Sequence, residues 1–169
     1  MAIITLEHLS DISAPLWNAL LPPDQVFLQH GFLSALEDSA SVSAKTGWKP
    51  VHRLLTDAQG MPLAALPLYL KSHSYGEYVF DMSWAEACAR AGIGYYPKLL
   101  TAVPFSPVSG ARLLGDAPGC EQLLDDLLAN MAQQGCSSLH INFTDTKADA
   151  VLRERDGWLE RLGCQYHWF

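Results

Sequence analysis

The chain has 169 residues, of which 49% are apolar and 17% are charged, and its formal net charge is −7. This balance is typical of one globular domain and excludes a disordered chain. With 11 Lys and Arg residues against 18 Asp and Glu residues, the sequence disfavours DNA and tRNA as partners, because nucleic-acid-binding surfaces are basic.

No segment is predicted to cross a membrane, to direct secretion or to bind a metal ion. The longest apolar run, residues 61–70, is shorter than a membrane span and contains two prolines. The first residues lack a basic segment followed by an apolar core, so we expect a cytoplasmic protein. The four cysteines form no C-x-x-C pair, so we expect no metal site.

The first half of the chain is predicted to alternate between strands and helices. Residues 2–8 are expected to form a strand, residues 13–20 a short helix capped by Ser13, and residues 28–37 a second helix. A hairpin follows, with arms at 51–56 and 61–70. Pro62 and Pro67 indicate that the second arm is not fully paired on both sides.

The second half continues this alternation, so the sequence predicts an α/β or α+β fold. Ser83-Trp84-Ala85-Glu86 has the spacing of a capping box and predicts the start of a helix that ends at Gly92. The remaining expected elements are a strand at 98–103, a loop at 104–119, a helix at 121–134, a strand at 138–143, short helices at 148–155 and 157–162, and a strand-like end at 165–169.

The densest group of reactive side chains lies in residues 71–81, between an apolar strand and a helix. Loops at strand ends often carry function because a rigid scaffold positions them. His73 and Glu77 are candidates for a general base and for the carboxylate that orients it. The alternative is a solvated connector in which Asp81 caps the following helix.

A second candidate segment is the loop that contains Gly110 and Arg112. Backbone amides in such a loop can bind a phosphate, and an arginine can add a bidentate contact. The alternative is a surface loop stiffened by proline, and the acidic residues Asp116 and Glu121 near the next helix weaken the phosphate interpretation.

The histidines outside residues 71–81 give weaker signals. His140 lies on the polar face of a predicted strand, where it lines a cleft if the sheet splays and is a covered structural group if it does not. His30 and His52 have no evident partners in the sequence and are expected at the surface.

Several segments in fixed order carry a family resemblance. They are Gly47-Trp48-x-Pro50-x-His52, residues 67–81, Trp84-Ala85, Tyr95-Tyr96-Pro97-Lys98-Leu99, residues 104–114, and Gly163-x-Gln165-Tyr166-His167-Trp168. In these segments the chain resembles the bacterial FemAB-like N-acyltransferases of the GNAT superfamily. The resemblance covers most of the chain and is densest from residue 47 to residue 114.

This resemblance implies a GNAT-like fold, in which a mixed and mostly antiparallel sheet splays near its middle and is flanked by helices. It also implies an enzyme in which a small-molecule or peptide amine attacks an acyl thioester, with acyl-CoA as the donor. Loop position and residue type suggest the roles of individual residues in such an enzyme. The candidates are His73 or Glu77 as base, Tyr96 as hydrogen-bond donor to the leaving thiol or carbonyl, Ser109, Gly110 and Arg112 beside the donor phosphates, and Lys71, Tyr75, Tyr78, Lys98, Phe105 and His140 in substrate binding.

Two departures from the family pattern bear on this implied activity. The usual phosphate-binding loop of GNAT enzymes, Q/R-x-x-G-x-G/A, is replaced by Ser109-Gly110-Ala111-Arg112. Family members also resemble two GNAT-like halves in tandem, whereas this single domain of residues 1–169 resembles the first half, so a second half is expected as a partner. The sequence therefore leaves open whether the chain is an enzyme. The alternatives are a non-catalytic binding or scaffolding half that recognises a peptidoglycan-type peptide, and a purely structural role for the polar segments.

Overall fold

Two chain segments, each forming two consecutive strands, organise the fold of the computed structural model, which describes residues 1–164. The strands are β2 (Trp48–Pro50), β3 (His52–Thr56), β4 (Pro62–Leu66) and β5 (Leu68–Lys71). The two segments run antiparallel to each other, and each passes from one sheet to another near its middle. Pro67, which has no N–H to donate, stands at the passage between β4 and β5.

The strands form two four-stranded sheets that share these two segments. One sheet has the order β1-β3-β4-β7 and the other has the order β2-β5-β6-β8. The additional strands are β1 (Ala2–Leu6), β6 (Lys98–Thr101), β7 (Leu114–Gly115) and β8 (Leu139–Ile141). In the described part of the chain, the pair β6–β8 is parallel and the other named strand pairs are antiparallel. The predicted α+β class is thus confirmed, and the GNAT-like fold stays a prediction.

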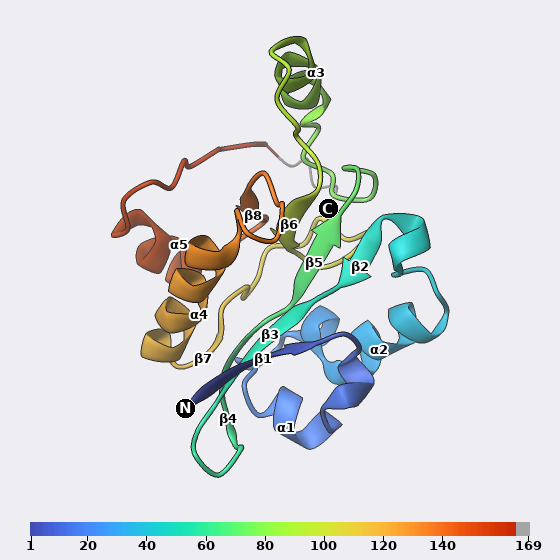
Figure 1. The fold of residues 1–169 in the computed structure, drawn as a ribbon. Coiled ribbons are helices and arrows are strands. Elements are labelled where there is room, and N and C mark those ends of the chain that lie inside the picture. The colour runs from blue at the N-terminus through green and yellow to red at the C-terminus, as the bar shows by residue number, and fades with distance from the viewer. Residues whose placement is uncertain (165–169) are drawn as a thin grey trace.

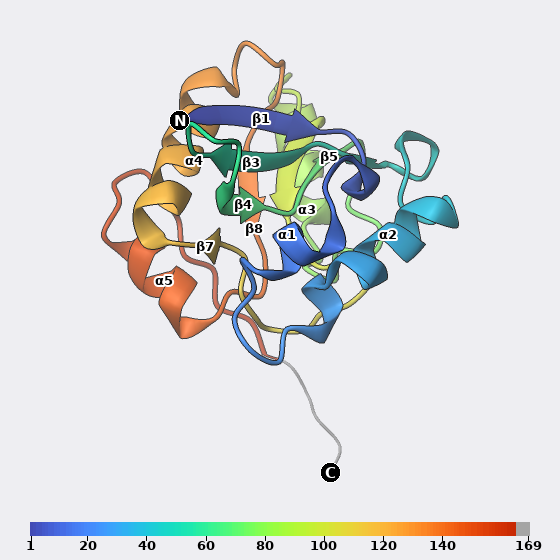
Figure 2. The same cartoon turned by 90° about the horizontal axis from the view of Figure 1, so that it is seen from below.

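Helices cover the sheets on two sides, as Figures 1 and 2 show. One side carries α1 (Ala14–Asn18) and α2 (His30–Asp38), together with the short 3-10 helices at Leu9–Asp11, Val26–Leu28 and Ala44–Thr46. The other side carries α4 (Ala117–Asn130) and α5 (Thr146–Arg153). Alternating residues of β3 separate the two cores, because Leu54 packs with the α1–α2 cluster and Leu55 packs with α4.

The predicted surface position of His52 is wrong, and His30 is half-buried with partners that the sequence did not suggest. His52 is 0% exposed, lies 3.0 Å from Glu37 through Nε2, and accepts the backbone N–H of Leu68 through Nδ1. The ring nitrogen Nε2 of His30 lies within 2.9 Å of the carbonyl oxygens of Leu9 and Ile12. Sequence spacing did not reveal these partners, because they come from distant parts of the chain.

Several predicted boundaries also need correction. The 61–70 arm is not one strand but two, β4 and β5, which lie in different sheets. Helix α4 begins at Ala117, because Asp116 caps it by accepting the N–H of Gly119 at 2.7 Å. Residues 158–164 are not helical, and the chain turns at Gly157 with a φ of 86°. The predicted strand at 165–169 lies outside the described residues.

Residues 72–97 form an arm that projects from the end of the sheet between β5 and β6 (Figure 1). The arm contains α3 (Met82–Arg90), none of whose residues is buried. The predicted capping box at Ser83 is wrong, since the helix begins one residue earlier and Asp81 holds the cap position. Among the described residues, no helix is long and apolar enough to span a membrane.

Candidate functional site

The last residue of β5 and the first residue of β6 are lysines that face each other at the root of the arm. Lys71 and Lys98 are register partners, and both side chains are 0% exposed. Buried ammonium groups need carboxylates nearby, because an unpaired buried charge is costly. The arm supplies Glu77 and Asp81, each of which is 2% exposed. We call these four residues the lysine–carboxylate cluster.

Lys98 lies at the centre of the lysine–carboxylate cluster. Its Nζ atom lies 2.8 Å from Glu77 Oε2, 2.6 Å from Asp81 Oδ2 and 2.9 Å from Ser74 Oγ. Each of its three N–H groups therefore has an acceptor. Because these acceptors belong to the arm and Lys98 belongs to the sheet, the ion pairs fasten the arm to the sheet.

Lys71 is less completely paired than Lys98. Its Nζ atom lies 3.6 Å from the ring centroid of Trp48, 3.4 Å from the carbonyl oxygen of Tyr75 and 3.9 Å from Glu77 Oε1. The indole of Trp48 donates to the same Tyr75 oxygen at 3.0 Å. Burial lowers the pKa of Lys71 to about 7, against the opposing effect of the Glu77 charge.

The pKa values of the two carboxylates in the cluster shift in opposite directions. Burial raises the pKa of Glu77, and the hydrogen bond and charge of Lys98 offset this effect only in part. Burial would also raise the pKa of Asp81, but hydrogen bonds from Lys98 and from the Tyr95 hydroxyl, together with the Lys98 charge, hold it at about 2. Glu77 and Lys71 are thus the members whose pKa values move toward neutrality.

Two carboxylate oxygens of the cluster are buried without a hydrogen-bond partner, namely Oε1 of Glu77 and Oδ1 of Asp81. Such an atom costs about 1–3 kcal/mol in a protein interior. An oxygen of this kind can accept a hydrogen bond from an amine or take up a proton. The cluster therefore has unused acceptor capacity, although solvent does not reach it in this conformation.

Tyrosine hydroxyls extend the network around Lys98. The Tyr95 hydroxyl donates to Asp81 Oδ2 at 2.7 Å. The Tyr96 hydroxyl lies 2.8 Å from Ser74 Oγ, which accepts from Lys98. Of the three residues expected to act in catalysis, Glu77 and Tyr96 thus lie in one hydrogen-bonded network.

His140 approaches the network from β8. Its ring centroid lies 6.1 Å from that of Tyr95, and its Nε2 atom lies 2.9 Å from Ser138 Oγ. Burial, followed by the charge of Lys98, lowers the pKa of His140 to about 4. The imidazole is therefore neutral at pH 7 and is a weaker base than an ordinary histidine.

His73 and Glu77 do not form the expected base–carboxylate pair. The Nδ1 atom of His73 accepts the N–H of Tyr75 at 3.2 Å, and its ring packs on Gly47, where an added Cβ would lie 2.3 Å from Nε2. Glu77 turns instead toward Lys98 and Lys71. Burial and the charge of Lys71 lower the pKa of His73.

The loop expected to bind donor phosphates uses most of its donors internally. Arg112 is 1% exposed, and its guanidinium donates to the carbonyl oxygens of Val108, Ala111 and Asn142. The amide of Gly110 donates to the Phe143 carbonyl, and the amide of Ala111 donates to Gln25 Oε1. Ser109 is exposed. This arrangement disfavours the predicted phosphate contacts of Gly110 and Arg112.

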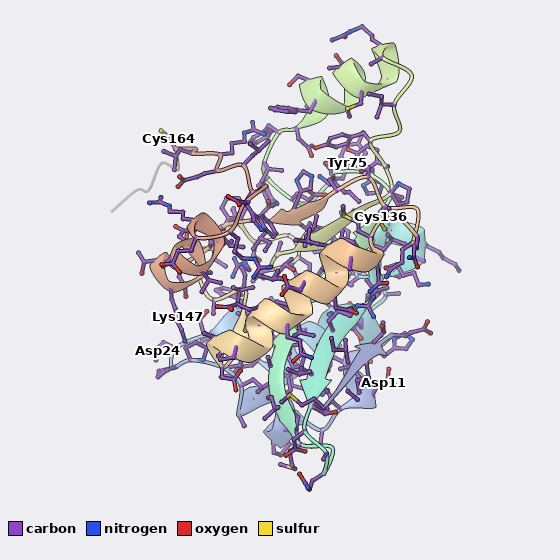
Figure 3. The ribbon with its side chains drawn as sticks, turned by 60° about the vertical axis from the view of Figure 1, so that its left-hand side comes forward. Asp11, Asp24, Tyr75, Cys136, Lys147 and Cys164 are labelled. Carbon is purple, nitrogen blue, oxygen red and sulfur yellow. The ribbon has the colours of Figure 1, made fainter. Side chains whose placement is uncertain are left out.

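Aromatic side chains lie around the root of the arm. Phe105 is 38% exposed, and its ring centroid lies 5.3 Å from that of Trp48. Tyr75 is 77% exposed and lies between α3 and the sheets (Figure 3). Phe105, Tyr78 and Phe80 have φ values of 57°, 60° and 50°, a strained region for such residues that is often found at functional sites.

The arm beyond the cluster presents large apolar side chains to solvent. They are Tyr75, Tyr78, Phe80, Met82, Trp84 and Ile93. Phe80 is 75% exposed and Trp84 is 56% exposed. The arm carries two further ionic side chains, Glu86 and Arg90, which pair with each other at 4.0 Å. Exposed apolar groups gathered on one projecting element are typical of interaction surfaces.

Sequence reasoning missed Ser74, Asp81, Tyr95 and Trp48 as members of this site. Asp81 was considered only as a helix cap, whereas its carboxylate makes no cap bond and pairs with Lys98. One signal was available in the sequence. Lys71 ends one apolar strand, Lys98 begins the next, and two carboxylates stand four residues apart in the segment between them. Within residues 1–164 no group of His, Cys, Asp and Glu side chains is arranged to hold a metal ion.

Comparison with known proteins places the chain in a family. The FemAB-like family model, described as peptidoglycan biosynthesis/recognition, matches residues 8–169. A search of curated proteins and a search of solved structures gave no match.

Proposed function

The chain belongs to the FemAB-like family of peptidoglycan biosynthesis/recognition proteins, and we propose that it recognises a peptidoglycan-type peptide through its arm. The observation that carries this proposal is the exposed apolar surface of residues 75–93, which sits on a root anchored by buried ion pairs. An anchored aromatic surface suits binding, because aromatic side chains lose little conformational freedom on contact and supply large areas.

Two further observations support recognition over catalysis by this chain alone. The lysine–carboxylate cluster is closed to solvent, so a substrate amine does not reach Glu77 unless the arm moves. The loop at 109–112 has its Gly110 amide and Arg112 guanidinium engaged within the protein. In this proposal the expected second GNAT-like half completes any catalytic centre, and this chain presents the peptide to it.

The test is calorimetric titration of the chain with a synthetic stem-type peptide. We expect saturable binding that Trp84→Ala weakens by about tenfold or more, as for an aromatic residue at the centre of a contact surface. Ile4→Ala is the matched control, because Ile4 is 42% exposed but lies on β1, away from the arm. If Trp84→Ala bound the peptide as tightly as the wild type, the arm would not be the surface that recognises it.

A second candidate function is N-acyl transfer from acyl-CoA to a small-molecule or peptide amine. Its support is the raised pKa of Glu77, which suits a general base, beside Lys71 with a pKa of about 7. Glu77 would accept the proton of the attacking amine after the arm has moved from the sheet. The Tyr96 hydroxyl would donate toward the developing oxyanion or the leaving thiol.

Titration with acetyl-CoA, longer acyl-CoAs and free CoA separates the two functions. Micromolar binding that depends on the acyl group, followed by transfer to a peptide amine, supports the enzyme. Loss of transfer in Glu77→Gln but not in His73→Ala would identify Glu77 as the base. Absence of CoA binding by a folded chain that still binds the peptide supports recognition alone.

A further inference from the structure

A recess apart from the arm lies between β1, β3 and the C-terminal end of α4. It has a volume of about 400 Å³ and is lined by Ile3, Arg53, Asp126, Asn130, Gln133 and Gln134. We call it the polar groove. Its volume falls within the range of sites for small ligands. Figure 3 shows α4 crossing over the strands of the sheet.

The polar groove contains one cationic and one anionic side chain that do not pair with each other. Arg53 and Asp126 both line it, and no ion pair joins them in the described structure. Arg53 donates through Nη1 to the Thr5 hydroxyl, while its buried Nε atom has no hydrogen-bond partner. The Nε atom is buried and does not face the groove, but no hydrogen bond engages Nη2 within residues 1–164, so the guanidinium keeps donor capacity there.

Asp126 is held in place on the opposite wall. Its Oδ1 atom accepts from Asn130 Nδ2 at 3.0 Å, and the same amide nitrogen donates to the Asp126 carbonyl oxygen at 2.8 Å. No partner joins its second carboxylate oxygen within residues 1–164. The end of α4 adds the negative end of a helix dipole, which favours a bound cation on this wall.

We propose that the polar groove binds a small zwitterion, either a free amino acid or a dipeptide, with its carboxylate at Arg53 and its ammonium at Asp126. The separated charges give the ligand a direction, because each end of a zwitterion matches one wall and is repelled by the other. The carboxamides of Asn130, Gln133 and Gln134 offer both donors and acceptors to the ligand between its charged ends.

In the experiment the full chain is titrated with alanine, glutamine and alanylalanine, and NMR and calorimetry monitor binding. N-acetylalanine lacks the ammonium, and alaninamide lacks the carboxylate. We expect the zwitterions to bind with a Kd at or below about 1 mM, and each blocked ligand to bind about tenfold more weakly or worse.

Two variants assign the ends of the ligand. Asp126→Asn should weaken binding of the zwitterions about tenfold and leave binding of N-acetylalanine unchanged. Arg53→Met should weaken binding of the zwitterions and leave binding of alaninamide unchanged. Asp125→Asn is the control, because Asp125 is the adjacent residue but is 68% exposed and pairs with Arg155. Arg53→Lys serves as the second variant if Arg53→Met does not fold.

Any of three results overturns the proposal. The first is no saturable binding of any zwitterion at about 10 mM, a concentration tenfold above the expected limit. The second is equal binding of free and blocked ligands, and the third is an equal effect of Asp126→Asn and Asp125→Asn on zwitterion binding. The proposal does not depend on the function of the arm, so loss of peptide binding by Trp84→Ala leaves this test unaffected.

Discussion

Lys98 and Asp81 form an ion pair in the protein interior, with 2.6 Å between Nζ and Oδ2. Their side chains are 0% and 3% exposed. Lys98 begins β6, and Asp81 immediately precedes α3, so the pair joins the sheet to the arm. A buried pair of this kind stabilises the structure mainly by avoiding the cost of either charge alone.

Lys98→Met should therefore lower the free energy of unfolding by about 3–5 kcal/mol, because Glu77 and Asp81 lose their main partner while they remain buried. Urea denaturation measures the effect. Arg90→Met is the control, since Arg90 is 74% exposed in an i,i+4 pair, and it should change the free energy of unfolding by about 0.5 kcal/mol or less.

Hydrogen exchange shows whether Lys98→Met destabilises the arm alone or the whole fold. We expect the amides of residues 72–97 to exchange faster while those of β3 and β4 remain protected, because α3 packs little against the other helices and strands. Uniform loss of protection across both sheets would show that the ion pair supports the whole fold and not the arm in particular.

Lys71 should make the stability of the protein depend on alkaline pH. Its pKa is about 7 in the folded chain, against an ordinary value of 10.5. Between these values the unfolded chain binds more protons, so the Lys71 contribution to the free energy of unfolding rises from pH 7 to pH 10.5 and does not change below pH 7.

Urea denaturation of the wild type and of Lys71→Met at several pH values tests this prediction. The free energy of unfolding of the wild type should increase relative to that of Lys71→Met as the pH rises from about 7 to 10.5, since Lys71→Met has no group to titrate at this position. Lys45→Met, at an exposed position, is the control. A pH-independent difference between wild type and Lys71→Met would contradict the lowered pKa.

Arg112→Ala should destabilise the fold by about 3 kcal/mol or more, because three backbone carbonyls lose their donor. Arg153→Ala should change the free energy of unfolding by about 1 kcal/mol or less, since Arg153 is 62% exposed. A stable Arg112→Ala variant that lost acyl-CoA binding would instead favour the phosphate role expected from the sequence.

Alanine substitutions at two glycines of the arm distinguish the cost of backbone strain from the cost of a steric clash. Gly76 and Gly92 have φ values of 80° and 70°, but a Cβ at Gly76 would lie 2.6 Å from the Phe105 ring, whereas one at Gly92 would meet nothing within 4 Å. Gly92→Ala should cost about 1–2 kcal/mol. Gly76→Ala should cost about 1–3 kcal/mol more, measured by thermal denaturation, and should alter tryptophan fluorescence through Phe105 and Trp48. Equal costs would indicate that the Phe105 ring moves freely.

The sequence predicts most of the elements but not how the sheets are divided. Periodicity locates α4 and β3, because their apolar residues face a core that follows the same repeat. The strands β2 and β7 escaped prediction because three and two residues are too few to show a repeat. Pro67 signalled incomplete pairing, but only the fold shows that it marks the passage between two sheets.

The sequence singled out the segment that contributes most of the lysine–carboxylate cluster, but it paired the side chains differently from the structure. The sequence placed reactive groups at 71–81, and Lys71, Glu77 and Lys98 do meet there. It paired His73 with Glu77 because they are close along the chain. In the folded protein a buried carboxylate pairs with the strongest nearby cation, and Lys98 becomes a neighbour only when β6 pairs with β5.

The insertion of residues 72–97 between two paired strands also has a kinetic consequence. A tight hairpin turn closes with little loss of chain entropy, whereas closing a loop of this length costs about 2 kcal/mol more. The pairing of β5 with β6 must overcome that cost before Lys71 and Lys98 reach their carboxylates. We therefore expect β3 and β4, joined by the short turn at Asp57–Met61, to associate early during folding, and the sheet that carries the arm to form late.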